Sequence, residues 1–503
     1  MGTNDADQRL SMANLLATVM QNCGAHGLPN IARSASYHRR IVWALLFVSS
    51  LVFFVVNTMS MFSTFRSYEV AVNVELEYER EVKFPAVTLC NLNRITLHGM
   101  YMFEELRAFF KYYHHTTSIE STEEVVDFSL TDHYYDISLA ALNIVAKMPY
   151  EERFSTGHNL TSMLLTCTFE GYTCRPTNFT QFYNAIYGNC YTFNFFSENV
   201  KKVSRAGPLY GLTMELFIER DEYLSSLQQS AGLRVMVGSQ NQMPFPEDEG
   251  ITVSPGQETF IAVKKVKLDR KKAPFITNCT TTHSTIFSDI FNVSYSKQAC
   301  EKSCLAGFVL KSCGCADQRY GYNISQPPCL STNITQELCN TGVVNDYISG
   351  ALTCDCSLPC KEELYELTVS NAQWPVQAHV ETVVSALRQL PDFDEVNLPR
   401  DFVEKNVVKF NVYLGSQLHE HISEIPAYDF TRFLSDIGGQ VGLCMGVSIL
   451  TLFEFVEFIF DLVKIAILRV KGKKKVTSSE VNVKPLDATN STGGQTLSIY
   501  THM

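Results

Sequence analysis

The sequence predicts a membrane protein with two transmembrane helices per subunit and a large, disulfide-rich α+β domain outside the cell. Three observations predict this class. Two long apolar segments lie towards the two ends of the 503-residue chain, 14 of its 16 cysteines lie between them, and basic residues flank the outer end of each segment.

The first apolar segment predicts a transmembrane helix over residues 41–65, preceded by a polar cytoplasmic arm over residues 1–40. Residues 41–62 carry no charged side chain, and about 20 apolar residues are enough for a helix to cross the hydrocarbon core. The segment is too long for the core of a signal peptide, and no small-residue cleavage site follows it. We therefore expect a retained span.

The second apolar segment predicts a span over residues 434–468 that carries three acidic side chains. Glu454, Glu457 and Asp461 are spaced by three and four residues, which places them on one helical face. Carboxylates inside a bilayer usually face a water-filled path or a partner, and an acidic stripe in a pore attracts cations. The alternative is that the inner two lie at headgroup level beside Lys464.

Glycines interrupt the outer half of this second segment. Gly438, Gly439, Gly442 and Gly446 are expected to make it poor in helix, because glycines either break a helix or allow close helix packing. The Gly-Val-Ser step that ends at Ser448 is expected to be extended, with carbonyls facing a pore. Two helices cannot enclose water, so a pore requires an oligomer. The alternative is helix packing without a pore.

The basic residues beside the two apolar segments predict on which side of the membrane the chain termini lie. Basic residues lie just before the first span, at Arg39 and Arg40, and just after the second, within residues 469–475. The positive-inside rule puts both termini in the cytoplasm. Residues 66–433 are then extracellular, and residues 469–503 form a cytoplasmic tail.

The extracellular region carries the features of an oxidising compartment. Its even, clustered cysteines indicate a disulfide framework, and ten of them fall within residues 279–360, which predicts a locally stapled unit. Cys23 and Cys444 lie in the arm and in a span, so they are expected to be free thiols. Six N-glycosylation sequons lie in this region: Asn159, Asn178, Asn278, Asn292, Asn323 and Asn333. A seventh, at Asn490, lies in the tail and is expected to stay unmodified.

Periodicity predicts mixed secondary structure in this region. Apolar and polar side chains alternate from Val408 to Leu414, which predicts a half-buried strand. Apolar side chains recur at helical spacing over residues 380–390 and 103–110, which predicts amphipathic helices. The net charge of −11 argues against nucleic acid as a partner and suits a surface that attracts cations. We find no nucleophile–base arrangement and no metal motif, so no enzyme, cofactor or resident metal is expected.

Five motifs in order along nearly the whole chain carry a resemblance. They are His26-Gly27, residues 84–93 (FPAVTLCNLN), residues 163–174 (MLLTCTFEGYTC), residues 187–194 (YGNCYTFN) and Gly446-Val447-Ser448, together with the ten-cysteine block. With these motifs the chain resembles the degenerin, epithelial sodium channel and acid-sensing ion channel superfamily.

The resemblance implies a sodium-selective, amiloride-sensitive channel of the plasma membrane. It implies a homotrimer, or a heterotrimer with related subunits, whose hand-like ectodomain has palm, β-ball, finger, thumb (about residues 279–360) and knuckle. It also implies seven disulfides: Cys90–Cys190, Cys167–Cys174, Cys279–Cys360, Cys300–Cys356, Cys304–Cys354, Cys313–Cys339 and Cys315–Cys329. In this reading, Gly446, Val447 and Ser448 form a belt that lines the narrow pore, His26 and Gly27 form a gating motif, and Ser435 lies where bulky residues hold family members open.

The gating stimulus stays open between two alternatives. Proton gating is supported on the finger side by Asp221 and Glu222 and on the thumb side by Asp346, while Thr341 replaces a second thumb carboxylate. Adjacent carboxylates can raise one another's pKa, although such pairs are more often simply solvated. The rival stimulus is a neuropeptide or another small extracellular ligand.

Positions near the first span also differ from the acid-sensing pattern. Glu69 and Val70 stand where those relatives carry a histidine pair, and Phe275 is the aromatic expected to meet Tyr68 at the wrist. Histidines that could titrate near neutral pH lie elsewhere: His114, His115, His419 and His421. More remote readings are a non-conducting two-span receptor and an ATP-gated trimeric channel.

Overall fold

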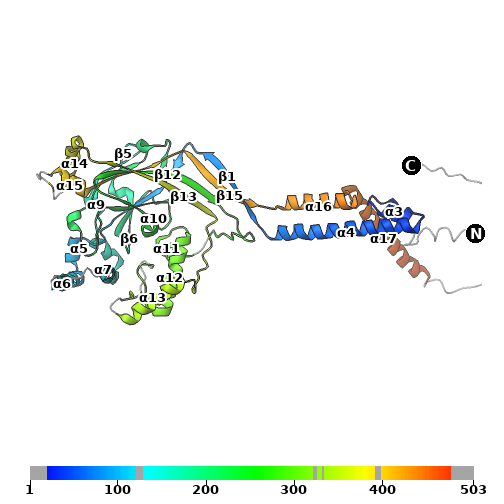
Figure 1. The fold of residues 1–503 in the computed structure, drawn as a ribbon, viewed down its shortest axis with the longest axis horizontal. Helices are drawn as coiled ribbons and strands as arrows, with labels where there is room; N and C mark the ends of the chain where they lie inside the picture. Colours follow the sequence, from blue (N-terminus) through cyan, green and yellow to red (C-terminus); the bar gives the residue numbers. More distant parts are fainter. Residues whose placement is uncertain are drawn as a thin grey trace, which may run out of the picture. The chain divides into compact units, whose positions relative to one another are not determined.

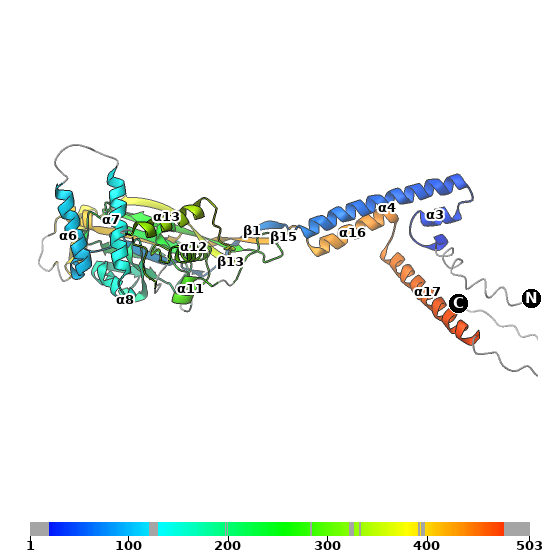
Figure 2. The ribbon, with the colours of Figure 1, turned by 90° about the horizontal axis from the view of Figure 1, so that it is seen from below.

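The computed structural model describes residues 20–119, 129–196, 198, 200–281, 284–320, 326–330, 333–390, 393 and 398–476. The chain divides into two compact units. The larger unit is Tyr68–Ala427, and the smaller unit combines the two ends of the chain, Met1–Ser67 and Tyr428–Met503. Figure 1 labels their helices and strands, and Figure 2 shows them from a second side.

An eight-stranded sheet forms the body of the larger unit. Its strand order is β1-β15-β12-β14-β9-β4-β5, and β13 also pairs with β12. The strands are β1 (Val70–Tyr78), β4 (Leu164–Phe169), β5 (Tyr172–Thr173), β9 (Leu212–Phe217), β12 (Gln257–Asp269), β13 (Lys361–Gln373), β14 (Val407–Leu414) and β15 (Leu418–Pro426). The edge strand β1 is antiparallel to β15, and β15 is parallel to β12.

A second sheet of five strands has the order β11-β10-β3-β7-β6. Its strands are β3 (Ala86–Asn91), β6 (Phe179–Asn184), β7 (Gly188–Phe193), β10 (Leu233–Gly238) and β11 (Ile251–Val253), and a separate pair joins β2 (Val82–Lys83) to β8 (Lys202–Val203). Both larger sheets join strands that are far apart in the sequence, so the unit depends on long-range pairing.

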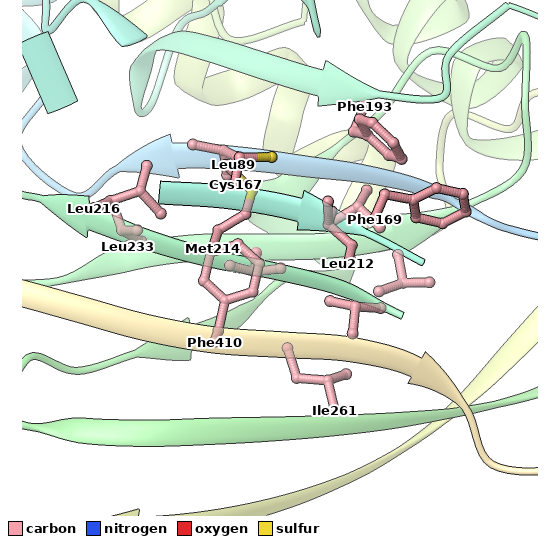
Figure 3. Packing of buried hydrophobic residues seen from close by; sticks show 14 of the residues in the cluster. Leu89, Cys167, Phe169, Phe193, Leu212, Met214, Leu216, Leu233, Ile261 and Phe410 are labelled. Atoms are coloured by element: carbon pink, nitrogen blue, oxygen red, sulfur yellow. The ribbon is translucent and has the colours of Figure 1, made fainter. Parts of the chain in front are cut away.

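The main core lies between these two sheets. Figure 3 shows Leu89, Phe193 and Leu233 of the five-stranded sheet packed towards Met214, Phe410 and Ile261 of the eight-stranded sheet. All of these side chains are buried. The strand predicted over residues 408–414 is confirmed as β14, and its alternate apolar side chains enter this core because successive side chains of a strand point to opposite faces.

Helices cover the rest of the larger unit. They are α5 (Leu97–Met102), α6 (Glu104–Ile119), α7 (Ser129–Ala146), α8 (Tyr150–Arg153), α9 (Leu160–Met163), α10 (Pro246–Glu249), α11 (Ile286–Phe291), α12 (Lys297–Cys313), α13 (Ile334–Ile348), α14 (Val380–Leu387) and α15 (Arg400–Asn406). Short 3-10 turns are η1 (Phe154–Thr156), η2 (Pro176–Asn178), η3 (Pro208–Tyr210), η4 (Arg220–Glu222) and η5 (Gln377–His379). Both predicted amphipathic helices are confirmed, as α14 and α6, with Val383, Leu387, Leu106 and Phe110 buried.

Five disulfides staple the unit built on α12 and α13, which lie side by side (Figure 1). Their pairs are nested along the chain: Cys279–Cys360, Cys300–Cys356, Cys304–Cys354, Cys313–Cys339 and Cys315–Cys329. The other two bonds are Cys90–Cys190 and Cys167–Cys174. All seven are the pairs that the resemblance implies, and Cys23 and Cys444 are free.

The smaller unit consists of apolar helices that are exposed in the single chain. They are α3 (Leu28–Arg33), α4 (Tyr37–Arg66), α16 (Phe430–Met445) and α17 (Ile449–Val476). By length and composition, α4 is long and apolar enough to cross a membrane, and α16 and the first part of α17 pass the same test only as a pair, bent by 79°. The described residues thus hold one such helix, or two if the bent pair is one span.

One sequence prediction about this unit is wrong. The outer half of the second segment was expected to be poor in helix, but Gly438, Gly439 and Gly442 all lie inside the helix α16. Glycine lowers helix stability by about 1 kcal/mol per residue, but tertiary packing routinely overrides such propensities, and α16 packs along α4 with Phe433 stacked on Phe65. The helix ends only at Gly446.

Candidate functional site

The break between α16 and α17 has a defined local cause. Gly446 has φ +63° and caps α16 in the left-handed conformation that glycine adopts without strain. Ser448 then starts the next helix, because its Oγ accepts a hydrogen bond from the backbone N–H of Thr451 at 3.3 Å. The Gly-Val-Ser step is therefore non-helical, but Gly446 is left-handed and not extended as expected from the sequence.

Residues 24–26 of the N-terminal arm contact both sides of this break. The backbone N–H of His26 donates to the carbonyl of Met445 at 2.7 Å, and the N–H of Gly24 donates to Oε2 of Glu454 at 3.0 Å. A side chain at Gly446 would overlap the His26 ring. The arm is thus hydrogen-bonded both to the C-terminal end of α16, at Met445, and to the side chain of Glu454 on α17.

Gly27 fixes the path of the arm on its way to the first span. It has φ +97° and is the N-cap of α3, and a Cβ at this position would lie 3.2 Å from Cδ2 of Phe47 in α4. Glycine is required here by both the backbone angle and the close approach. The His26-Gly27 motif is therefore held between α4 and the break in the second segment.

The acidic side chains of α17 differ in their surroundings. All three are exposed in the single chain, but only Glu454 accepts a hydrogen bond from the arm among the described residues. Their helical spacing puts all three on one face, as the sequence predicts. No local pattern predicts the Gly24–Glu454 contact, since it joins residues 430 positions apart.

The outer ends of α4 and α16 pack through aromatic rings. Phe65 stacks on Phe433 with centroids 4.9 Å apart, and the hydroxyl of Tyr428 donates to Asp436 at 2.6 Å. Ser435 lies between these contacts on α16 and is exposed in the single chain. No other element that the structure describes covers its side chain, which is the only outcome that the structure gives for this predicted gating residue.

The wrist pair expected from the sequence is in contact within the larger unit. The rings of Tyr68 and Phe275 meet edge to face with centroids 5.8 Å apart. Next to them, the N–H of Ala427 donates to the carbonyl of Glu69 at 2.9 Å. The two ends of this unit are thus tied together where the chain enters and leaves it.

A double-mutant cycle tests this ring contact. Edge-to-face aromatic pairs contribute about 0.5–1.5 kcal/mol beyond their buried area, so Tyr68→Ala and Phe275→Ala together should cost less than the sum of the two single changes. Thermal unfolding of the purified protein gives the coupling. Tyr68→Ala combined with a change of the exposed Tyr172 is the matched control and should be additive; equal additivity in both pairs would contradict the contact.

The carboxylates expected to sense protons are not joined in the structure. Asp221 and Glu222 lie in the turn η4, and Oε2 of Glu222 accepts the backbone N–H of His98 at 2.7 Å. Asp346 lies in α13, and no hydrogen bond among the described residues links it to either. Their sensing role stays a prediction. The side chains of His114 and His115 lie outside the described residues.

A buried pair that the sequence analysis missed lies beside this turn. Nδ1 of His158 is 2.5 Å from Oε2 of Glu219, and the His158 side chain is only 1% exposed. Glu219 has φ +52°, a strained backbone angle for this residue type. The pair anchors the start of η4. It lies within no motif that spacing alone would reveal, because β9 brings Glu219 to His158 from 61 residues away.

His419 and His421, which the sequence marked only as titratable, share one carboxylate. Nε2 of His419 and Nδ1 of His421 each lie 2.9 Å from an oxygen of Glu77, and Nε2 of His421 lies 3.1 Å from Asp269. Hydrogen bonds from His421 and His419 lower the pKa of Glu77 from 4.5 to about 2. The hydrogen bonds to Glu77 and Asp269 raise the pKa of His421 above 6.5.

The predicted glycosylation sites are accessible where the structure describes them. Asn159, Asn178, Asn278, Asn292 and Asn333 are all exposed. Asn323 lies outside the described residues, as do Asn490 and most of the tail. Exposure is the physical requirement for modification, so these five sites stay predictions that the structure permits.

A helix long enough to cross a membrane, a broken apolar helix with a carboxylate after the break, and a large disulfide-bonded domain are together typical of an ion-channel subunit. Within that class, the model of the amiloride-sensitive sodium channel family matches residues 19–458. The chain belongs to this family.

Individual relatives include both epithelial sodium channel subunits and an acid-sensing ion channel. The epithelial sodium channel subunit beta-2 of Xenopus laevis is 34% identical over 337 residues, covering 65% of this chain and 51% of that protein. The human epithelial sodium channel subunit beta is 32% identical over 355 residues, covering 69% and 54%. Acid-sensing ion channel 1A of Danio rerio is 29% identical over 448 residues, covering 86% and 85%.

The chain spans about half the length of the epithelial sodium channel subunits that it matches. Among solved structures, a proton-activated chloride channel aligns with a TM-score of 0.29 and 6% sequence identity, over 85% of this chain and 98% of that one.

Proposed function

We propose that the chain is the pore-forming subunit of a sodium-selective, amiloride-sensitive channel of the plasma membrane, assembled as a homotrimer with both termini in the cytoplasm. The observation that carries the proposal is the break at Gly446–Ser448 with Glu454 below it and the N-terminal arm seated against both. Family membership supports the same conclusion. The chain then works without catalysis or a cofactor, and the permeant species is Na⁺.

The pore follows from the geometry of the break. At a non-helical step, backbone carbonyls are released from the helix and can coordinate a cation. Three copies of Gly446, Val447 and Ser448 around an axis would give a narrow ring of such oxygens. Glu454, and below it Glu457 and Asp461, would raise the local concentration of cations on the inner side.

The arm gives a physical means of gating. His26 and Gly27 lie between the end of α16 and Phe47 of α4, so a shift of either helix changes the hydrogen bonds to Met445 and Glu454. The thumb, stapled by five disulfides, is stiff enough to act as a lever. Tyr68 and Phe275 at the wrist are proposed to pass its movement on.

We propose a proton as the stimulus, with a peptide or another small ligand as the alternative. The similarity to acid-sensing ion channel 1A over 86% of this chain supports a proton as the stimulus. Asp221, Glu222 and Asp346 support it as candidate sensors. The hydrogen bond that fixes Glu222 to the His98 backbone favours the alternative. A non-conducting receptor is the remote alternative, and the broken helix argues against it.

A pH step distinguishes these readings. When the chain is expressed in oocytes, stepping the bath from pH 7.4 to pH 5 without peptide should open a sodium-preferring current that amiloride blocks. Uninjected oocytes are the control. A peptide-evoked current with no response to acid would contradict proton gating alone, and silence under acid, alkali and peptides at a normal surface level would contradict the channel.

A further inference from the structure

Three neighbouring strands bring metal-ligating side chains to one face of the eight-stranded sheet. In the register of β1 with β15, Glu77 lies opposite His419 and Glu75 lies opposite His421. Opposite residues of an antiparallel pair share a face, and so do alternate residues of one strand. Glu79 is therefore on this face too.

The donor atoms converge on Glu77. The ligand atoms of Glu75, Glu77 and His421 all lie within 4.8 Å of one another, and so do those of Glu77, Glu79 and His419. Zinc binds nitrogen and oxygen at about 2.0–2.2 Å, so donors on opposite sides of one ion lie up to about 4 Å apart. Each group of three could therefore surround one ion after small side-chain movements, and because both groups share Glu77 only one of them can be filled at a time.

His421 is oriented as a metal-bound histidine usually is. Nδ1 of His421 faces Glu77, while its Nε2 lies 3.1 Å from Asp269 on β12. A carboxylate on the far ring nitrogen is the common outer-shell partner of a metal-bound histidine, because it fixes the ring and raises its basicity. Asp269 would serve this purpose here.

His419 supplies an independent observation. It is 2% exposed, and its Nδ1 is a buried polar atom without a hydrogen-bond partner among the described residues. Its Nε2 lies 2.9 Å from Glu77 and 3.6 Å from Glu79. If Nε2 bound a metal, Nδ1 could carry the single proton of the neutral imidazole ring, so binding would need no further change at this side chain.

Lys267 supplies the positive charge in the ion-free cluster. Its Nζ lies 3.5 Å from Glu77 and forms an ion pair with Glu79. Both glutamates would be free for a metal if this flexible side chain swung aside. Glu77, Lys267, Asp269 and His421 also line one wall of a cavity of about 980 Å³, which gives an ion a path to the cluster.

We propose that Glu77 binds a zinc-like divalent cation together with one of its two histidines, either His421 completed by Glu75 or His419 completed by Glu79, in competition with Lys267. Imidazole nitrogens with carboxylates suit zinc, whereas calcium takes oxygen ligands in larger number. No resident metal is expected from the sequence motifs. Bound zinc would join β1, which begins two residues after Tyr68, to β15, which ends next to Ala427, and so would clamp the two strands that lead to the spans.

Zinc binding to the purified full-length protein tests the site directly. Titration of chelator-treated protein with zinc chloride should show one ion per chain and a raised thermal midpoint. His419→Ala combined with His421→Ala should remove both effects. Asp269→Asn should weaken binding by about 10- to 100-fold, the usual cost of losing such an outer partner. Lys267→Met should tighten it, because the competing ammonium is gone.

The controls separate the site from non-specific binding and from the channel proposal. His98→Ala changes an exposed histidine elsewhere and should leave the zinc affinity unchanged. Unchanged binding in the double histidine variant, or calcium displacing zinc at equal concentration, would overturn the proposal. Because binding is measured without current, a silent channel that still binds zinc would contradict only the proposed function. Lys267→Met keeps the test decisive if the histidine variants do not fold.

Discussion

Replacing Gly446 by alanine is expected to abolish the sodium current. Gly446 has φ +63°, and a side chain in the left-handed region costs about 1–2 kcal/mol. The added Cβ would also overlap the ring of His26, so either the break in the helix or the seat of the N-terminal arm must move. Whole-cell current at a matched surface level measures the effect.

Gly442→Ala is the matched control for this change. Gly442 lies one turn earlier inside α16, and the nearest atom to a Cβ there is the carbonyl oxygen of Val447 at 4.0 Å, an ordinary contact distance. Its current should stay close to that of the wild type. Full current through the Gly446→Ala channel would show that the break does not line the pore. The main structural support for the proposed function would then be lost.

Replacing Ser435 by phenylalanine is expected to give a current without any stimulus. Ser435 is exposed on α16. In the proposed trimer a neighbouring subunit would contact it in the closed state, and overpacking of such a contact costs about 1–3 kcal/mol. A cost of that size, borne by the closed state alone, shifts the closed–open equilibrium by about 5- to 150-fold. Amiloride-sensitive current at rest is the measurement.

Ser435→Ala controls for loss of the hydroxyl and should stay closed at rest. The mutant must also reach the cell surface, which biotin labelling reports. A Ser435→Phe channel that is present at the surface and silent at rest would count against a pore formed by α16 of several subunits. It would leave the larger unit and its zinc site unaffected.

Short-range patterns explain which parts of the fold were predictable. The strand at residues 408–414 and the helices α6 and α14 were found from periodicity, because one buried face repeats every two residues in a strand and about every 3.6 in a helix. The exception is α16. Its glycines have a low helix propensity, and the packing of α16 against α4 outweighs it.

The candidate sites divide in the same way. Glu454 and the Gly-Val-Ser step are visible in the sequence, since a carboxylate and a cluster of small residues stand out in an apolar segment. The hydrogen bond from Gly24 to Glu454 and the pair His158–Glu219 are not visible, because each joins residues that only the folded chain brings together.

The sequence by itself determined the two apolar segments, the cysteine framework and the acidic face of the second segment, because hydropathy and spacing are local properties of a chain. The seven disulfide pairs were implied only through the resemblance, and the structure has the same pairs. Tertiary structure alone decided the register of β1 against β15, which sets Glu77 opposite His419, and the seat of the arm at Gly446. A one-residue slip of β1 in that register would turn Glu75, Glu77 and Glu79 to the other face, away from the two histidines of β15.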